Sequence, residues 1–534
     1  MAHPALGPAR STPAARSTLA LIVAGTIARI VLAATIGLGI DESYAAAVAR
    51  PFSLSYYDHP PLVFWLAGTM EALSHGNHRV LLRLPFILLF AGTTWLIFRV
   101  TERSFGPRAG LYAALLLTLS PVMSVSSSGW VLPDGPLLFA IAATALCLSH
   151  IFFGPRQETR RWWLGAGGTV GLALLSKYHA AFLIAGALVF VATSPPARQW
   201  LRRPAPYVAM GIALMMALPV MIWNAQHGWA SFRFQAGRAA SASGNPAISL
   251  LQNLGGQAGY VLPWIWLPLI WVFIAGVRRG PAAAARWLFV CLSAGPIVFF
   301  TLVSLGGRPG LPHWPAPGFL LLFPLLGDAL SRMEVRGCER AVRRYLVFST
   351  ASFVGLMAFV ATQTATGWFS RAVPGLFQHG DPSLDAVDWT GARAALARYG
   401  VLDPNSVIVA RNWIEAGKLG YALGPDQHVV CLDADARQFQ FIAGTRHLTG
   451  HAAVLVTRVR TGNNDAEAPA GFAWAGTIPV YRAGYEVFRL AVYRETDARK
   501  SQNDSTSSIT SSPASSAFPL GRSPVFARGP SRSR

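Results

Sequence analysis

Two adjacent carboxylates, Asp41 and Glu42, follow directly on a long apolar stretch near the start of the chain. A pair of acids at a membrane edge often marks only the beginning of a loop. Here the polar segment Tyr57-Asp58-His59 follows soon after, with two prolines directly behind it. A carboxylate can deprotonate an attacking hydroxyl, and carboxylates near a histidine can bind a divalent cation. The sequence therefore indicates acid–base chemistry and leaves a divalent metal open.

Two further ionisable residues interrupt apolar runs. Asp134 lies in the segment Pro133-Asp134-Gly135-Pro136, where it could simply cap a helix, although a capping carboxylate can also bind a partner. Lys177 has apolar residues on both sides. A charge in such a place is costly and is a functional hypothesis by default, with a lysine reaching towards the membrane surface as the structural alternative. A compact ammonium group here could pair with a phosphate.

The segment of residues 306–317 is rich in glycine and proline, which disfavour regular helix. Irregular backbone between membrane spans persists only where it is buried in protein or lines a cavity. Arg308 is therefore a second candidate for phosphate binding, and His313 is either a ligand or a structural hydrogen-bonding residue. Arg83 could reach the same phosphate, although Arg83 and Arg29 also fit structural roles inside a helical bundle.

The composition indicates a membrane protein. Of the 534 residues, 52% are hydrophobic and only 13% are charged, whereas a soluble domain carries about 25% charged residues. The net charge of +21 would suggest nucleic-acid binding in a soluble protein, but here the basic residues stand in short clusters between apolar runs, as membrane topology requires. The four cysteines include no Cys-x-x-Cys pair, so we expect neither a thiolate metal site nor a disulfide framework.

About 11 apolar runs, and at most about 13, are expected to cross the membrane as helices. They lie at residues 18–40, 80–100, 109–125, 133–153, 162–176, 178–193, 206–224, 260–277, 285–305, 314–330 and 345–362. The first run is too long for a cleavable signal peptide, and we expect it to remain as a span.

One set of loops between these runs carries the basic clusters, and the alternate loops carry few cations. The clusters contain Arg99, Arg103, Arg108, Arg156, Arg160, Arg161, Arg198, Arg202, Arg203, Arg278, Arg279, Arg286, Arg332, Arg336, Arg340, Arg343 and Arg344. Basic loops remain in the cytoplasm. We therefore expect the N-terminus inside, and the candidate site residues and everything after residue 363 on the periplasmic side of a bacterial inner membrane.

The chain divides into four predicted parts. Residues 1–17 and 496–534 are rich in Ser, Pro, Ala and Arg, and we expect them to be disordered. Residues 18–362 form an all-α membrane bundle, whose first outer loop, 41–79, lies on the membrane surface as short helices. Residues 363–495 alternate helical and strand-like patterns, which predicts a small α/β domain. The helical patterns lie at 392–399 and 413–423, and the strand-like ones at 407–409, 428–432, 453–457 and 486–493.

These residues resemble a known family, the bacterial GT-C glycosyltransferases related to protein O-mannosyltransferases. Its relatives include rhizobial lipopolysaccharide-core sugar transferases and the lipid A aminoarabinose transferase. The resemblance covers about residues 18–495 and is carried by Asp41-Glu42-Ser43-Tyr44, Tyr56-Tyr57-Asp58-His59-Pro60-Pro61-Leu62, Arg83-Leu84-Pro85, Phe105-Gly106-Pro107-Arg108, Asp134-Gly135-Pro136-Leu137, Leu175-Ser176-Lys177-Tyr178, Trp314-Pro315-Ala316-Pro317 and Ala416-Gly417-Lys418-Leu419. Each motif alone is weak, and their common order is fairly specific.

The resemblance implies a hexosyl- or pentosyltransferase that moves a sugar from a polyprenyl-phosphate carrier to a lipid, lipopolysaccharide or protein acceptor on the periplasmic face. It also implies that Asp41 is catalytic. One departure concerns the residue before the paired prolines. Many relatives have lysine there, and this chain has His59, as the rhizobial subgroup does. The identity of the donor sugar stays open for this reason.

The expected mechanism is an inverting transfer in which Asp41 is the base and Lys177 and Arg308 hold the donor phosphate. Glu42 and Asp134 would orient the acceptor or help to hold a cation. The expected substrate-binding residues are Tyr57, Asp58, His59, Arg83, Asp134, Lys177, Arg308 and His313. The main alternative is a transporter or lipid-linked-sugar flippase, which would place ionisable residues near the midplane. A non-catalytic assembly protein is a third possibility, but it leaves Asp41 and Lys177 without a purpose.

Overall fold

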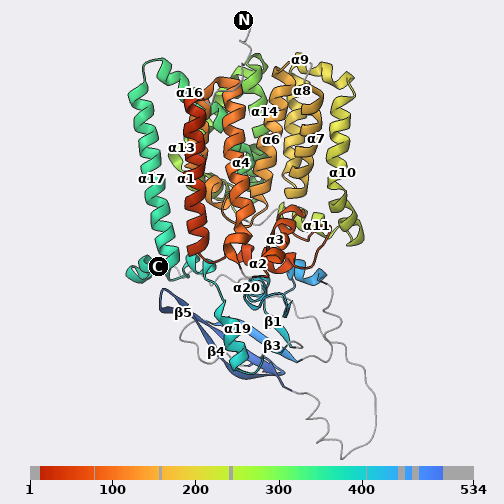
Figure 1. The fold of residues 1–534 in the computed structure, drawn as a ribbon, viewed down its shortest axis with the longest axis vertical. Helices are drawn as coiled ribbons and strands as arrows, with labels where there is room; N and C mark the ends of the chain where they lie inside the picture. The colour runs from red at the N-terminus through yellow and green to blue at the C-terminus, as the bar shows by residue number, and fades with distance from the viewer. Residues whose placement is uncertain are drawn as a thin grey trace, which may run out of the picture.

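The computed structural model describes residues 12–76, 78–155, 159–239, 244–403, 406–442, 452–459 and 468–496. A bundle of apolar helices carries a small β-sheet at one end (Figure 1). This arrangement confirms the predicted fold class. Of the predicted tail 496–534 the structure describes only residue 496, and of the predicted N-terminal segment 1–17 it describes residues 12–17. Helix α1 begins at Pro13, earlier than the predicted residue 18, and the side chain of Thr12 caps it.

The bundle consists of helices that follow one another along the chain with short connections. They are α1 (Pro13–Thr35), α4 (Arg79–Phe105), α5 (Pro107–Thr118), α6 (Asp134–Phe153), α7 (Thr159–Ser176), α8 (Ala180–Thr193), α9 (Pro195–Arg198), α10 (Ala205–Gln226), α12 (Pro246–Val261), α13 (Pro263–Arg279), α14 (Ala284–Val303), α15 (Ala316–Leu320), α16 (Phe323–Val335) and α17 (Glu339–Thr366). Every predicted span overlaps at least one of them. Among the described residues, six helices are long and apolar enough to cross a membrane alone, or up to eight if two bent pairs each count as one span. The number 11 stays a prediction.

The helices differ in how much of their apolar surface other parts of the protein cover. In α6, 72% of the apolar window is buried, and α6 therefore lies at the centre of the bundle. In α1, α10 and α17 the buried share is 11%, 17% and 6%. Apolar side chains so widely exposed are stable only in a lipid environment, so these three helices form the lipid-facing periphery.

The two ends of the bundle are built differently. In Figure 1 the N-terminus and α9 lie at the upper end, while α2 (Ile40–Ala49), α3 (Leu62–Leu73), α11 (Ala230–Ala239) and the sheet lie at the lower end. Helices α2 and α3 belong to the first outer loop and confirm that this loop contains short helices. Helix α11 was not predicted from the sequence.

The C-terminal sheet has five strands in the order β2-β1-β3-β5-β4. They are β1 (Val407–Ala410), β2 (His428–Cys431), β3 (Ala453–Val459), β4 (Phe472–Arg482) and β5 (Tyr485–Glu495). Strand β1 pairs in parallel with β2 and β3, and β5 pairs antiparallel with β3 and β4. Four strands fall where the sequence predicts them. Strand β4 was missed because Gly476 and Pro479 weaken its strand pattern.

The sheet is joined to the first outer loop through α20 (Trp413–Leu423), which packs on α2; a further short helix of this region is α19 (Gly391–Arg398). A β-carbon on Gly417 would lie 2.8 Å from Cα of Tyr44, so only glycine permits this close approach. Lys418 is buried between the two parts, where its ammonium group donates hydrogen bonds to the carbonyl oxygens of Leu38 and Val387. Residues 416–419, one of the motifs that carry the family resemblance, therefore lie in the helix that packs the C-terminal domain against the first outer loop.

Candidate active site

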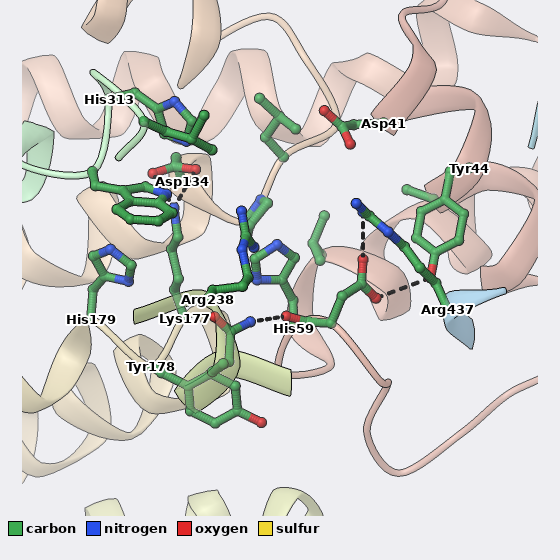
Figure 2. A pocket seen from close by; sticks show the side chains of 18 of the residues that line it. Asp41, Tyr44, His59, Asp134, Lys177, Tyr178, His179, Arg238, His313 and Arg437 are labelled. Carbon is green, nitrogen blue, oxygen red and sulfur yellow. Dashed lines mark hydrogen bonds and ion pairs between the residues drawn. The ribbon is translucent and has the colours of Figure 1, made fainter. Parts of the chain in front are cut away.

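A cavity of about 450 Å³ lies where the first outer loop, the end of the bundle and the C-terminal domain meet. Its lining side chains come from α2, α3, α6, α8, α11, α14, α20, the 3₁₀ helix Arg437–Phe441 and the connecting segments between helices. Six of the predicted site residues line it, namely Asp41, Asp58, His59, Asp134, Lys177 and His313. Figure 2 shows the side chains of most of these residues turned towards a common space.

Asp41 lies in the first turn of α2 and exposes its side chain to the cavity. Within the described part of the chain, no group forms a hydrogen bond or an ion pair with its carboxylate. The surrounding protein desolvates the carboxylate and raises the pKa of Asp41, while the nearby cation of Arg437 lowers it and Glu42 raises it. A carboxyl group that has a raised pKa and no partner is suited to accept a proton from a substrate.

The position of Glu42 does not fit its predicted role in orienting the acceptor. Its side chain is buried and does not line the cavity. The guanidinium of Arg83 donates hydrogen bonds of 2.7 and 2.6 Å to the two carboxylate oxygens of Glu42. The backbone N–H groups of Gly39 and Val131 donate to the same carboxylate. Because these donors occupy both oxygens, Glu42 anchors α2 instead of touching a substrate.

The predicted phosphate contact of Arg83 is corrected for the same reason. Arg83 is buried in α4 and donates to the carbonyl oxygens of Ile36 and Gly37 as well as to Glu42. These bonds hold the connection between α1 and α2 against α4. Since Asp41 directly precedes Glu42, the Arg83–Glu42 pair fixes the position of the Asp41 carboxylate.

Asp134 and Lys177 form a buried ion pair on one side of the cavity. The ammonium nitrogen of Lys177 lies 2.9 Å from one carboxylate oxygen of Asp134 and 3.0 Å from the other. Asp134 is the first residue of α6, and Lys177 directly follows the last residue of α7. The pair thus binds the ends of two helices together, and Lys177 is already neutralised before any substrate arrives.

Three histidines surround this pair, namely His59, His179 and His313 (Figure 2). Burial lowers the pKa of His59 and that of His313, and the charge of Lys177 lowers both further; the pKa of His313 falls to about 4. These two rings are therefore neutral at physiological pH. In the described part of the chain, Nδ1 of His59 is buried without a hydrogen-bond partner.

Asp58 stands at the opposite side of the cavity in a network with the C-terminal domain. The hydroxyl of Tyr44 donates a 3.0 Å hydrogen bond to Asp58, and a terminal nitrogen of Arg437 lies 3.7 Å from the other carboxylate oxygen. The side chain of Gln235 donates to the backbone carbonyl of Asp58. Burial raises the pKa of Asp58 to about 6, against the opposing effect of Arg437. Asp58 therefore links the first loop, α11 and the C-terminal domain.

Arg238 lies in α11 and lines the middle of the cavity between these two sides (Figure 2). Its guanidinium carbon lies 5.4 Å from the ring centre of Trp314 and 5.5 Å from that of Phe234. Among the described residues, no carboxylate forms an ion pair with Arg238 and no group accepts a hydrogen bond from it. Arg238 is thus a cation held against aromatic rings with its donors available.

Besides Glu42 and Arg83, two further predicted residues do not line the cavity. The ring of Tyr57 packs between those of Phe234 and Phe441, at centre distances of 4.8 and 5.6 Å. Arg308 is exposed and does not line the cavity. Arg308 belongs to the glycine- and proline-rich segment 306–317, of which Leu311, His313 and Trp314 line the cavity.

Residues 58–223 match the protein family described as dolichyl-phosphate-mannose-protein mannosyltransferase. This segment resembles that family, and it makes up less than half of the chain. The matched residues include five of the cavity residues described above, Asp58, His59, Asp134, Lys177 and His179. The family match and the cavity therefore concern the same part of the molecule.

The fold is the GT-C fold of membrane glycosyltransferases. ArnT from Cupriavidus metallidurans, solved in complex with undecaprenyl phosphate, is similar to the chain with a TM-score of 0.62. The sequence identity is 17%, and the similarity covers 91% of this chain and 99% of that protein. At this identity the likeness shows the fold alone.

Curated relatives share part of the sequence. The lipid A galacturonosyltransferase RgtD of Rhizobium johnstonii is 29% identical over 293 residues, which are 54% of this chain and 60% of that protein. The lipopolysaccharide core galacturonosyltransferase RgtB of the same organism is 23% identical over 64% of this chain and 70% of that protein. The match thus spans about three fifths of the length of RgtD.

Two cations of this cavity, Arg238 and Arg437, were missed from the sequence. Each lies in a segment that the predicted topology places on the side of the first outer loop, where the loops between spans carry few cations. Lys177 was predicted as a site residue because it is a cation on this side of the membrane. The same reasoning applies to Arg238. Arg437 carries a weaker signal, because many arginines occur in the C-terminal domain. Only the docking of α20 shows that Arg437 reaches the cavity.

The carboxylates and histidines of the cavity are the candidate ligands for a metal ion. Among the described residues, no group of three or more His, Cys, Asp or Glu side chains is arranged to hold a metal ion. The two acids once expected to share a cation with Asp41 have other partners, since Glu42 binds Arg83 and Asp134 binds Lys177.

Proposed function

We propose that the protein is a membrane glycosyltransferase that moves a sugar from a polyprenyl phosphate to a hydroxyl of a lipid, lipopolysaccharide or protein acceptor. One observation carries the proposal. Asp41 and Arg238, a carboxylate and a guanidinium without ionic partners among the described residues, line one cavity at the end of an apolar bundle. Such a pair supplies the base and the phosphate-binding cation that the reaction requires.

The charges of the cavity support this assignment of roles. Six of its lining side chains are acidic or basic, and two oppositely charged pairs account for four of them, Asp134 with Lys177 and Asp58 with Arg437. Asp41 and Arg238 are left over, one of each sign. A phosphate that bound Lys177 would have to compete with Asp134, whereas Arg238 can accept it directly. Arg238 is therefore the primary phosphate-binding residue, and Lys177 contributes from its fixed position beside it.

The reaction follows from this placement. The acceptor hydroxyl attacks the anomeric carbon, its proton passes to Asp41, and the bond between that carbon and the phosphate oxygen breaks. The electron pair of the broken bond stays on the phosphate, which leaves as an anion and needs stabilisation by Arg238 instead of a proton. A single displacement from the opposite face inverts the configuration of the anomeric carbon.

The apolar part of the cavity fits the lipid part of the donor. Phe182, Phe299, Phe300 and Val303 line this part. Phe299 is 43% exposed, and its neighbour Leu302 on α14 is 56% exposed. The cavity therefore meets the lipid-facing surface of the bundle at α14, and a polyprenyl chain can leave the site there without crossing a polar surface.

The orientation and the substrates are part of the same proposal. The arginine-rich connections lie towards the N-terminal end of the bundle, which we assign to the cytoplasm. The cavity and the sheet then face the periplasm of a bacterial inner membrane. The names of RgtD and RgtB make galacturonic acid the first sugar to test and lipid A or the lipopolysaccharide core the first acceptor.

The proposal is tested with the full chain in proteoliposomes. Undecaprenyl phosphate that carries galacturonic acid, aminoarabinose or mannose is supplied with lipid A, and the sugar transferred to lipid A is measured by mass spectrometry. We expect transfer from at least one donor and none with Asp41→Asn. Movement of a labelled donor between leaflets without formation of a glycosidic bond would instead identify a flippase and overturn the proposal.

A further inference from the structure

Arg437 reaches the cavity from the C-terminal domain. It begins a 3₁₀ helix, Arg437–Phe441, that follows strand β2. Its guanidinium carbon lies 3.6 Å from the ring centre of Trp413, the first residue of α20. Of the cations near Asp41, Arg437 has the strongest electrostatic effect on that carboxylate. A residue far from Asp41 in the sequence thus stands beside it in space (Figure 2).

The backbone at Arg437 is held in an unfavourable conformation. Its φ angle is +49°, in the left-handed region that non-glycine residues rarely adopt. Such a conformation persists only where the surroundings enforce it, and it concentrates at binding sites. Here the backbone N–H of Gln438 donates to the hydroxyl of Tyr44, and the side chain of Gln438 accepts from the N–H of Tyr57. The ring of Phe439 packs on Tyr44.

The ion pair of Arg437 with Asp58 is loose. The closest nitrogen and oxygen are 3.7 Å apart, beyond hydrogen-bond distance, whereas Lys177 and Asp134 are joined by bonds of 2.9 and 3.0 Å. The Nε atom of Arg437 is buried, lies 3.8 Å from a carboxylate oxygen of Asp435 and has no hydrogen-bond partner among the described residues. No group in the described part of the chain accepts a hydrogen bond from the terminal nitrogens of Arg437, so these donors are available towards the cavity.

We propose that Arg437 is a specificity-determining residue that binds an oxyanion, a carboxylate or a phosphate, carried by one of the two reacting partners. Arginine recognises such groups through paired, charge-assisted hydrogen bonds. Arg238 lies towards Lys177 and takes the phosphate that leaves. Arg437 lies on the other side of Asp41, beside Tyr44, and therefore faces the donor sugar or the acceptor. The inference rests on the proposed function and assigns the C-terminal domain a part in substrate selection.

Two matched pairs of substrates test the inference and identify the source of the oxyanion. The donors are undecaprenyl phosphate linked to galacturonic acid or to galactose, and the acceptors are lipid A with and without its phosphates. The dissociation constant of each is measured for the full chain in nanodiscs, together with its turnover. We expect wild-type protein to prefer the charged member of one pair by about tenfold or more, the effect of one charge-assisted interaction.

The variant Arg437→Gln should remove this preference for that pair and leave the other pair unaffected, and Arg437→Lys should retain part of it. The control is Arg398→Gln, an exposed arginine of the same domain at the end of α19, which should retain the full preference. A preference that is absent from wild-type protein, or unchanged in Arg437→Gln for both pairs, overturns the inference. Failure of the proposed function is distinct, because wild-type protein would then bind these lipids without transferring any sugar.

Discussion

Lys177 and Asp134 bind one another through both carboxylate oxygens, with nitrogen–oxygen distances of 2.9 and 3.0 Å. Both side chains are buried, at the ends of α7 and α6. The sequence marks each residue as a separate site candidate, one for phosphate and one for the acceptor. The pairing changes both interpretations, because each group already satisfies the charge of the other. Among the described residues, Asp41 and Arg238 are the charged groups of the cavity that form no ion pair.

The variant Lys177→Ala leaves the carboxylate of Asp134 buried without its cation. Removing one partner of a buried ion pair costs about 3–5 kcal/mol, so the thermal unfolding midpoint in detergent should fall clearly. The double variant Lys177→Met/Asp134→Leu should regain much of this stability, since no unpaired charge remains. A Lys177→Ala protein as stable as wild type would show that the pair does not hold α6 to α7.

The Arg83–Glu42 pair should support activity indirectly, by fixing α2. Glu42→Gln removes the charge that Arg83 binds at 2.6 Å, so both stability and turnover should fall, the turnover less than in Asp41→Asn. The control is Glu102→Gln, which breaks the exposed pair of Arg99 with Glu102 and should cost no more than about 1 kcal/mol. If Glu42→Gln reduced turnover without any change in stability, Glu42 would have to act on the substrate itself.

Arg238 should determine the affinity for the donor. A hydrogen bond to a charged group contributes about 1.5–3 kcal/mol, so Arg238→Ala should raise the donor KM by roughly tenfold to a hundredfold. The KM of the acceptor should change little. Arg233→Ala is the matched control, an exposed arginine of the same helix that does not line the cavity. Equal donor KM values for wild type and Arg238→Ala would instead indicate that Lys177 binds the donor phosphate.

The pH dependence of activity should report Asp41. As a base, Asp41 must be ionised, and desolvation raises its pKa above the ordinary value. The rate kcat/KM should therefore fall as the pH decreases through this raised pKa. Arg437 and Arg238 lower the pKa of Asp41, while Glu42 and Asp385 raise it. Arg437→Gln should accordingly shift the acidic limb to higher pH, and Arg398→Gln should leave it in place. An unshifted limb in Arg437→Gln would exclude this electrostatic contact.

The sequence predicts the elements whose pattern is local. The apolar runs give the helices, and the helical pattern at 413–423 coincides with α20. The pairing of Glu42 with Arg83 was not predictable, because it joins α2 to α4 and depends on how the connection from α1 folds back. Both charges look available in the sequence, and only packing shows that they are occupied.

The contributions of α11 and the C-terminal domain were missed for a related reason. Helix α11 is short and has no continuous apolar run, so Arg238 was not placed in any predicted element. Arg437 reaches Asp41 only because Gly417 lets α20 approach α2 closely. Such long-range contacts leave no periodic signal, and the cation that most affects Asp41 therefore lay outside the predicted site.

The central claim is that Asp41 is the base of a glycosyl transfer. The most direct measurement is the turnover of Asp41→Asn, which keeps the shape of the side chain and removes its ability to accept a proton. General-base catalysis contributes roughly 10²–10⁴-fold in rate, so we expect turnover to fall by at least about a hundredfold. The unfolding midpoint should not fall, because Asp41 forms no hydrogen bond or ion pair within the described residues. Wild-type turnover in a correctly folded Asp41→Asn protein would contradict the account.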